Sequence, residues 1–330
     1  MAETLHFALP DATLHAAFNY LDLELAKRAQ AELDPDQTGD PFRLNVANAL
    51  WGQDGYHFES TFLDLLAVNY GAGLRLVDYE RAPEPARQTI NAWVSDQTEQ
   101  KIPELIPEGL VDSSTRLVLT NAIYFNASWD LPFDEELTHP GTFHADVGDV
   151  TVDMMVEQDN YRYAAGDGYQ TIALPYVGDE LDMVLVVPEA GKFAEVEGSL
   201  ADGALDSMLA ELQAAEVQLT VPKWSFRSEV LLKDQLSALG MAEAFSTSAD
   251  FSGMTGTRAL CIADVVHEAF VDVDEEGTEA AAATAVIMWE TSVPEPIEPI
   301  ELTVDRPFLF LIRDLPTETV LFLGRVTDPS

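Results

Sequence analysis

The side chains that most often carry catalysis or bind metals do not form a recognisable site in this sequence. No two histidines stand four residues apart, the spacing at which a helix presents a pair to zinc. The sequence also lacks the Gly-x-Ser-x-Gly turn of a hydrolase and the glycine-rich loop of a nucleotide site, and Gly71-Ala72-Gly73 fits a turn. We therefore predict no catalytic residue, no metal site and no cofactor. The histidines are His6, His15, His57, His139, His144 and His267.

One segment, residues 273–288, stands out because it is made largely of small side chains. Alanine is the best helix former and Thr278 could cap a short helix, so local propensity favours a helix. The alternation of residues favours a strand instead, with every second residue from Thr278 to Met288 on one face. Gly277 provides a hinge, and such a segment could slide between two existing strands without steric conflict. The prolines at 294, 296 and 299 then favour an extended, exposed tether.

The elements that must position this segment are helices and strands without regular alternation, which indicates an α+β fold with mainly antiparallel sheets. Apolar stripes predict a helix around Leu14–Leu25, packed on the protein surface, and another around Ile90–Thr98. Patterns of buried or alternating residues predict strands at 116–126, 150–155, 169–176, 181–187 and 216–227, and a hairpin of 308–313 with 319–326.

The strand at 116–126 is apolar on both faces, as expected of a central strand, yet Asn121 lies in its middle. A buried amide needs hydrogen-bond partners, and His267 is the candidate for one. A core pair without function is the alternative interpretation.

Several motifs, in the same order along the chain, resemble those of the serpin family. The reactive-loop hinge of that family is similar to the segment Glu275-Glu276-Gly277-Thr278-Glu279 followed by the alanines Ala280, Ala281, Ala282 and Ala283. The family's central strand, the segment after it and the strand leading into its loop are similar to Asn121–Phe125, Trp129 with Pro132-Phe133, and Val266–Ala269. The C-terminal signature is similar to Arg306–Phe310 and Leu323–Val326.

This resemblance implies a single serpin domain over residues 1–330, with about seven to nine helices and a reactive-centre loop at 274–300. It also implies a suicide inhibitor of serine proteases rather than an enzyme: the cleaved loop inserts into the main sheet after the acyl-enzyme has formed. Asn121, Trp129 and His267 would belong to the region where that sheet opens. The alternative is a non-inhibitory binding protein on the same scaffold, although the hinge lacks the proline or bulky charges typical of such relatives.

The usual loop length of the family places the scissile bond at Thr291-Ser292, with Glu290-Thr291 as the alternative. A threonine before the scissile bond favours elastase-like or subtilisin-like proteases, which have small specificity pockets. Glu290 would select a glutamate-specific protease, and Met288 or Trp289 a chymotrypsin-like one.

The composition restricts the partners. The chain has 58 acidic and 17 basic residues and a formal charge of -41, which argues against nucleic acid and anionic membranes. No apolar run is long enough to span a bilayer. The family resemblance implies that the first helix is the region that can bind heparin, but only Lys27 and Arg28 are basic there, so we expect no heparin site. We expect a monomer with an acidic, solvated surface, which would suit a saline environment.

The single cysteine, Cys261, lies in an apolar setting and is expected to be buried.

The beginning of the chain resembles the third helix of serpins. The resemblance therefore implies that two helices and a strand would precede Met1, lost through a misassigned start or in a truncated variant. No signal peptide is visible at Met1. The family resemblance favours an extracellular or cell-surface location.

Overall fold

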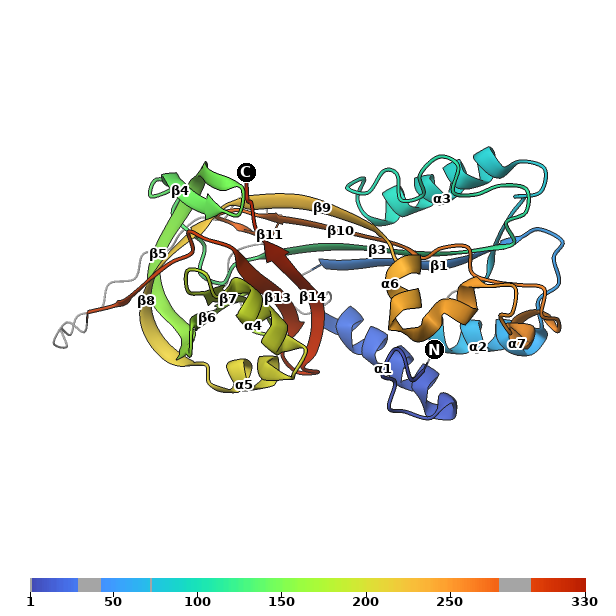
Figure 1. The fold of residues 1–330 in the computed structure, drawn as a ribbon, viewed down its shortest axis with the longest axis horizontal. Coiled ribbons are helices and arrows are strands. Elements are labelled where there is room, and N and C mark those ends of the chain that lie inside the picture. The colour runs from blue at the N-terminus through green and yellow to red at the C-terminus, as the bar shows by residue number, and fades with distance from the viewer. Residues whose placement is uncertain (1, 29–42, 72, 279–297) are drawn as a thin grey trace. The chain divides into compact units, whose positions relative to one another are not determined.

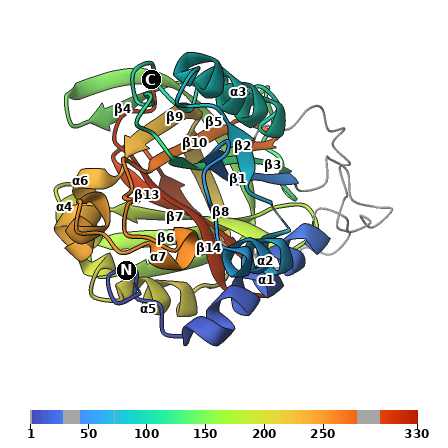
Figure 2. The ribbon, with the colours of Figure 1, turned by 90° about the vertical axis from the view of Figure 1, so that its right-hand side faces the viewer.

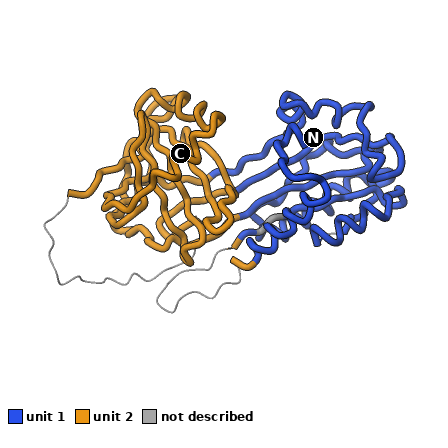
Figure 3. Tube along the Cα trace, turned by 90° about the horizontal axis from the view of Figure 1, so that it is seen from below, with its two compact units in different colours: residues 1–26, 44–124, 226–270 blue, residues 27–43, 125–225, 271–330 orange. Residues whose placement is uncertain are grey.

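The computed structural model describes residues 2–28, 43–71, 73–278 and 298–330 of the 330-residue chain (Figure 1). The chain forms two compact units, each assembled from separate stretches of sequence (Figure 3). Unit 1 comprises residues 1–26, 44–124 and 226–270, and unit 2 comprises residues 27–43, 125–225 and 271–330.

The first sheet has six strands in the order β2-β1-β3-β11-β10-β9. They are β1 (Arg43–Gln53), β2 (Arg75–Val77), β3 (Leu117–Ser128), β9 (Trp224–Leu231), β10 (Val266–Val273) and β11 (Gly277–Thr278). Strands β3 and β10 also pair directly and in parallel, from Thr120 with Val266 to Tyr124 with Phe270. The prediction that this part of β3 is buried on both faces is wrong, because Thr120, Ala122 and Tyr124 are buried whereas Asn121 and Ile123, on the other face, are only half-buried.

Within unit 1, helix α3 (Pro83–Gln97) lies over the sheet (Figure 1). Pro83 stands at its first turn, where a missing N–H costs nothing, and Ile90 and Val94 are fully buried beneath it. The remaining helical segments of this unit are α1 (Asp11–Arg28, whose last two residues belong to unit 2), α2 (Ser60–Tyr70), α6 (Lys233–Leu236), a π segment η1 (Ser237–Met241), a 3₁₀ turn η2 (Ala242–Phe245) and α7 (Ser252–Thr255).

Helix α1 differs from the prediction of a packed apolar stripe. None of its described side chains is buried, and Phe18 retains 39% of its surface. The helix lies beside α2, where the His15 Nδ1 atom is 2.7 Å from the Tyr70 hydroxyl (Figure 2). The periodicity was sufficient to predict the helix, but it does not determine whether another element covers the apolar face.

Unit 2 is built on an eight-stranded sheet in the order β12-β8-β5-β6-β7-β13-β14, with β4 paired to β5. Its pairs are antiparallel except for β12 with β8. All residues of β7 are buried, and α4 and α5 pack their apolar side chains against β7 and β13. The bounds are β4 (His139–Ala145), β5 (Gly148–Gly166), β6 (Tyr169–Pro175), β7 (Leu181–Pro188), α4 (Phe193–Leu200), α5 (Ala204–Ala210), β8 (Gln213–Pro222), β12 (Ile300–Thr303), β13 (Phe308–Asp314) and β14 (Thr319–Val326).

The α+β class with mainly antiparallel sheets is confirmed, and the described part of the chain contains seven α-helices. The prediction of a single strand at 216–227 is wrong. This stretch belongs to two strands, β8 and β9, which lie in different sheets and are separated by Lys223. Pro222 ends β8, and proline has no N–H with which to continue a ladder.

Candidate functional site

Two residues of the predicted hinge, Gly277 and Thr278, form strand β11, which lies between β3 and β10. Gly277 pairs with Ser128 and Thr278 with Ala127, both antiparallel, and Thr278 also pairs with Val273. Both hinge residues are buried. The strand-like alternation predicted from Thr278 onward therefore has its first residue inside the sheet. Residues 279–297 lie outside the described part of the chain, and with them Glu279, Ala280, Ala281, Ala282, Ala283 and both candidate scissile bonds.

Gly277 is required here by close backbone contact. A Cβ atom at this position would lie 2.2 Å from the carbonyl oxygen of Ala127 and 2.7 Å from the Ser128 Cα. Real Cβ atoms do not approach backbone atoms so closely, so any larger residue must displace β11 from β3.

The side chain of Asp274 stabilises the turn that precedes β11. The Asp274 carboxylate accepts hydrogen bonds from the backbone N–H groups of Glu276 (2.9 Å) and Gly277 (3.2 Å). Burial raises the pKa of Asp274, and these two bonds oppose that effect. The segment after β3 holds the turn from outside, because Trp129 donates its backbone N–H to the Glu276 carbonyl and its indole N–H to the Asp274 carbonyl.

Glu275 is fixed by two side chains from other parts of unit 2. Its carboxylate lies 2.6 Å from Lys223 Nζ and accepts a hydrogen bond from the Thr138 hydroxyl at 2.7 Å. Burial alone would raise the pKa of Glu275, but the bonds from Lys223 and Thr138 outweigh it and lower the pKa. The ion pair therefore anchors the start of the hinge as a charged group.

The Thr278 side chain is buried beside the aromatic side chain of Tyr176. Its hydroxyl lies 2.8 Å from that of Tyr176, and both side chains are fully buried. Tyr176 stacks on Trp129, with ring centroids 4.5 Å apart, and meets Phe125 edge-on at 5.1 Å. Burial holds the pKa of Tyr176 well above its ordinary value, so the phenol is neutral. Trp129 consequently contacts both the turn and the residue that receives Thr278.

Asn121 and His267 form the pair predicted from the sequence. They are register partners on β3 and β10, and His267 Nδ1 lies 2.5 Å from Asn121 Oδ1. The Asn121 amide nitrogen donates to Asn48 Oδ1 at 2.6 Å, so its oxygen must accept the proton of His267. Burial lowers the pKa of His267, which favours this neutral donor form. A role of the pair in opening the sheet stays a prediction.

Sequence reasoning missed Lys223 and Tyr176. Lys223 is 52 positions from Glu275, and Tyr176 is 102 positions from Thr278. No local pattern relates residues so far apart, although a lysine directly after Pro222, within the strand predicted at 216–227, is a signal that a partner is needed.

Other candidate chemistry gives no second site. Among the described residues no cluster of His, Cys, Asp and Glu could hold a metal ion, and no described helix is long and apolar enough to cross a membrane. The prediction of a buried Cys261 is wrong, because the residue is exposed. Apolar neighbours in sequence did not place it in the core, since residues 261–265 form no helix or strand that would turn one face inward.

Comparison with known proteins agrees with this architecture. The family model described as "Serpin (serine protease inhibitor)" matches residues 1–329. A serpin-like protein of Thermococcus kodakarensis is 38% identical over the whole chain, which covers 75% of that protein. The leukocyte elastase inhibitor of Bos taurus is also 38% identical, with the whole chain covering 86% of it. The crystal structure of Serpin48 from the insect Tenebrio molitor superposes with a TM-score of 0.81 at 30% identity, covering 99% of this chain and 84% of that one. The chain therefore belongs to the serpin family of serine protease inhibitors.

Proposed function

We propose that this serpin inhibits serine proteases as a suicide substrate whose cleaved loop inserts between β3 and β10. The observation that carries the proposal is β11, because the hinge already occupies the first two positions of such a strand. After Glu279, residues 280–285 are alanines and one threonine, small side chains that could follow it without steric conflict. A target would cut the loop while Glu275, Gly277 and Thr278 hold its near end in the sheet.

The proposed reaction begins as ordinary proteolysis. The protease serine attacks the carbonyl carbon of Thr291, the peptide bond to Ser292 breaks, and the Ser292 nitrogen leaves as a free amine. The loop behind Thr291 then inserts before water can hydrolyse the ester, and it carries the protease along. Glu290-Thr291 is the alternative bond.

The proposed target is a protease with a small specificity pocket, elastase-like or subtilisin-like, and the complex contains one inhibitor and one protease. The threonine at 291 supports this choice. Similarity to proteins named leukocyte elastase inhibitor supports it independently.

The test is to mix the protein with a panel of serine proteases and to analyse the products on denaturing gels. We expect a covalent band of combined mass with an elastase-like or subtilisin-like enzyme, and no such band when the protease serine has been blocked beforehand. Mass spectrometry of the released fragment should find a new amino terminus at Ser292, or at Thr291 for the alternative bond. Clean cleavage of the loop without any covalent complex, across the whole panel, would overturn the proposal.

A further inference from the structure

A hollow in unit 1 lies where the helical segment after β9 changes its winding. Helix α6 continues into the π segment η1 and then into the 3₁₀ turn η2, so the helix first widens and then tightens. Such π segments are rare and are frequent at functional sites. Gly240, inside η1, has a φ of 114°, which glycine adopts without strain. Residues Gly240, Met241, Glu243 and Ala244 then form one wall of the hollow, whose volume is about 240 Å³.

The lining of the hollow is apolar and acidic. Its apolar part consists of three buried side chains and one half-buried ring, which belong to Met241, Ala244, Ala249 and Phe251. Its acidic part consists of the exposed residues Glu243 and Asp250. None of the described side chains that line the hollow carries an N–H or O–H donor. An anion would therefore find no side-chain partner there.

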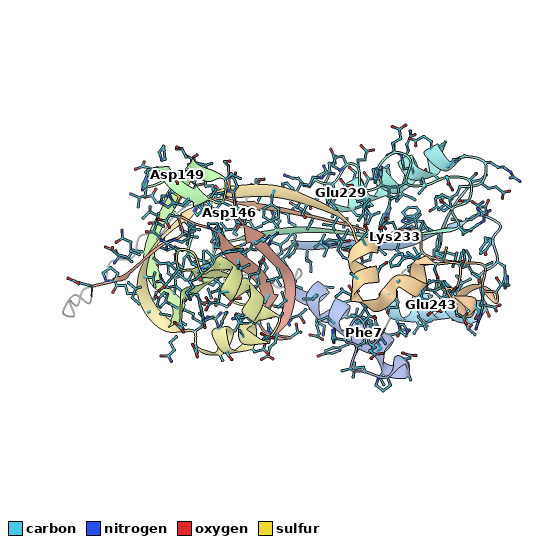
Figure 4. All side chains as sticks on the ribbon, viewed as in Figure 1. Phe7, Asp146, Asp149, Glu229, Lys233 and Glu243 are labelled. Atoms are coloured by element: carbon cyan, nitrogen blue, oxygen red, sulfur yellow. The ribbon has the colours of Figure 1, made fainter. Side chains whose placement is uncertain are left out.

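The two carboxylates of the hollow differ in what they bind. Asp250 accepts hydrogen bonds from the backbone N–H and the hydroxyl of Ser252, at 3.1 and 2.6 Å, and it pairs with Arg258 at 2.6 Å. Glu243 belongs to η2, and no described residue forms a hydrogen bond or an ion pair with its carboxylate (Figure 4). Because Arg258 offsets the charge of Asp250, the charge of Glu243 stays uncompensated beside the apolar lining.

These features select a ligand by its charge and by its hydrogen-bonding groups. The carboxylate of Glu243 and the formal charge of -41 attract cations. A cation with N–H groups would leave donors unpaired against the apolar lining, which is unfavourable. A metal ion needs several oxygen ligands together, and the described residues contain no cluster that could hold one. A quaternary ammonium group has no N–H, and its charge is attracted to aromatic rings such as that of Phe251.

We propose that this hollow binds a small organic cation that carries a quaternary ammonium group. Its volume is below the roughly 300–1,000 Å³ of pockets for drug-sized ligands, which suits a compact, methylated headgroup. A ligand that binds only the folded chain stabilises it by mass action, so stability would depend on the concentration of such compounds. The site uses no residue of the hinge or of the loop, and it is independent of protease inhibition.

The test uses choline as the probe and, as the control ligand, its uncharged analogue in which a carbon atom replaces the nitrogen. Binding is followed by NMR at the Met241 methyl group, in full-length protein labelled at its methionine methyls and at constant ionic strength. We expect choline to shift the Met241 signal until it saturates. The uncharged analogue should need a concentration at least about fivefold higher for the same shift.

Three variants separate the charge of the site from its apolar lining. Glu243→Gln should weaken choline binding about fivefold, the upper limit for an exposed ion pair, and leave the uncharged analogue unaffected. Phe251→Leu keeps the lining apolar and should weaken choline alone, by about threefold. The matched control is Glu229→Gln, which removes an equal charge from an exposed position on β9 and should leave binding unchanged (Figure 4).

A Met241 signal that does not respond to choline would overturn the inference. Equal affinity for choline and its uncharged analogue would do the same, because the hollow would then not select for charge. Choline binding that Glu243→Gln leaves unchanged, or that Glu229→Gln weakens equally, would show attraction to the overall charge of the protein instead of a site. Glu243 is exposed, so its substitution leaves the packing of the hollow intact, and a loss of binding in that variant does not reflect unfolding.

Discussion

The hydroxyl groups of Tyr176 and Thr278 lie 2.8 Å apart in the interior of unit 2, where neither side chain has exposed surface. The first side chain after the hinge glycine is thus enclosed. Whatever occupies position 278 must fit a buried position beside the neutral phenol of Tyr176.

Thr278→Arg should convert the inhibitor into a plain substrate. The neutral Tyr176 phenol cannot neutralise an arginine, and a buried unpaired charge costs several kcal/mol. A barrier raised by about 3 kcal/mol slows insertion more than a hundredfold, while deacylation is unaffected. Gels should show only clipped protein, whereas the control Thr278→Ser, which keeps the hydroxyl, should still form the covalent band. An arginine variant that traps protease with wild-type stoichiometry would contradict insertion through this hinge.

Glu275→Lys should destabilise the protein by about 1–3 kcal/mol, because it places two ammonium groups together and removes the acceptor of the Thr138 hydroxyl. The exposure of the Lys223 side chain, 38%, keeps the effect below that of a fully buried pair. Thermal or urea unfolding measures the change.

The control is the charge-reversed double variant, Lys223→Glu with Glu275→Lys. It should recover part of the loss, since the two residues are in contact and their effects are coupled. Simple addition of the two single effects would show that the pair contributes nothing to stability.

The pH dependence of stability should carry a contribution from Glu268. Burial raises its pKa above the ordinary value of 4.5, an effect that Arg227 opposes and Glu229 reinforces. Between these two pKa values the folded protein binds a proton that the unfolded chain does not. Stability from this group therefore rises as pH falls through the raised pKa, and it is fully present below the ordinary value.

The measurement is the difference in free energy of unfolding between wild type and Glu268→Gln, because the subtraction removes the other titrating groups. Wild type should gain on the variant as the pH is lowered. A difference that stays constant from roughly pH 4 to 8 would show that Glu268 has the same pKa folded and unfolded.

Added salt should raise the melting temperature. The formal charge of -41 repels itself in the compact state, and ions screen that repulsion. Melts in dilute buffer and in about 1 M KCl, where the screening length is about 3 Å, test this prediction. Sucrose at matched osmolarity is the control, because it screens no charge. Equal shifts in KCl and sucrose would exclude screening as the cause.

Prediction from the sequence succeeded at positions where a single physical constraint determines the local structure. The alternation from Thr278 onward predicted a strand, and Thr278, its one described residue, lies in β11. An amide in the middle of an apolar strand predicted the Asn121–His267 pair. The fold class followed from the mixture of helices and strands without regular alternation. What escaped prediction depends on contacts distant in sequence: Tyr176 and Lys223 gain their roles from hinge residues far along the chain, and the exposure of Cys261 and of α1 depends on which elements cover them.

The register of β3 would determine which of its residues an inserting strand reaches with each added residue. Thr278 stands opposite Ala127 in an antiparallel pair, so each further residue would step back one position along β3. Asn121 is six positions from Ala127, and the sixth residue after Thr278 would come opposite it, displacing His267 as its neighbour. From Tyr124 back to Thr120, every step would exchange one parallel ladder for two antiparallel ones, which makes retreat unfavourable. A cut closer than six residues to Thr278 would leave an inserted strand too short to reach the Asn121–His267 pair. The distance of the cleaved bond from Thr278, as well as the side chain before that bond, would therefore decide whether a protease is inhibited or only cleaves the loop.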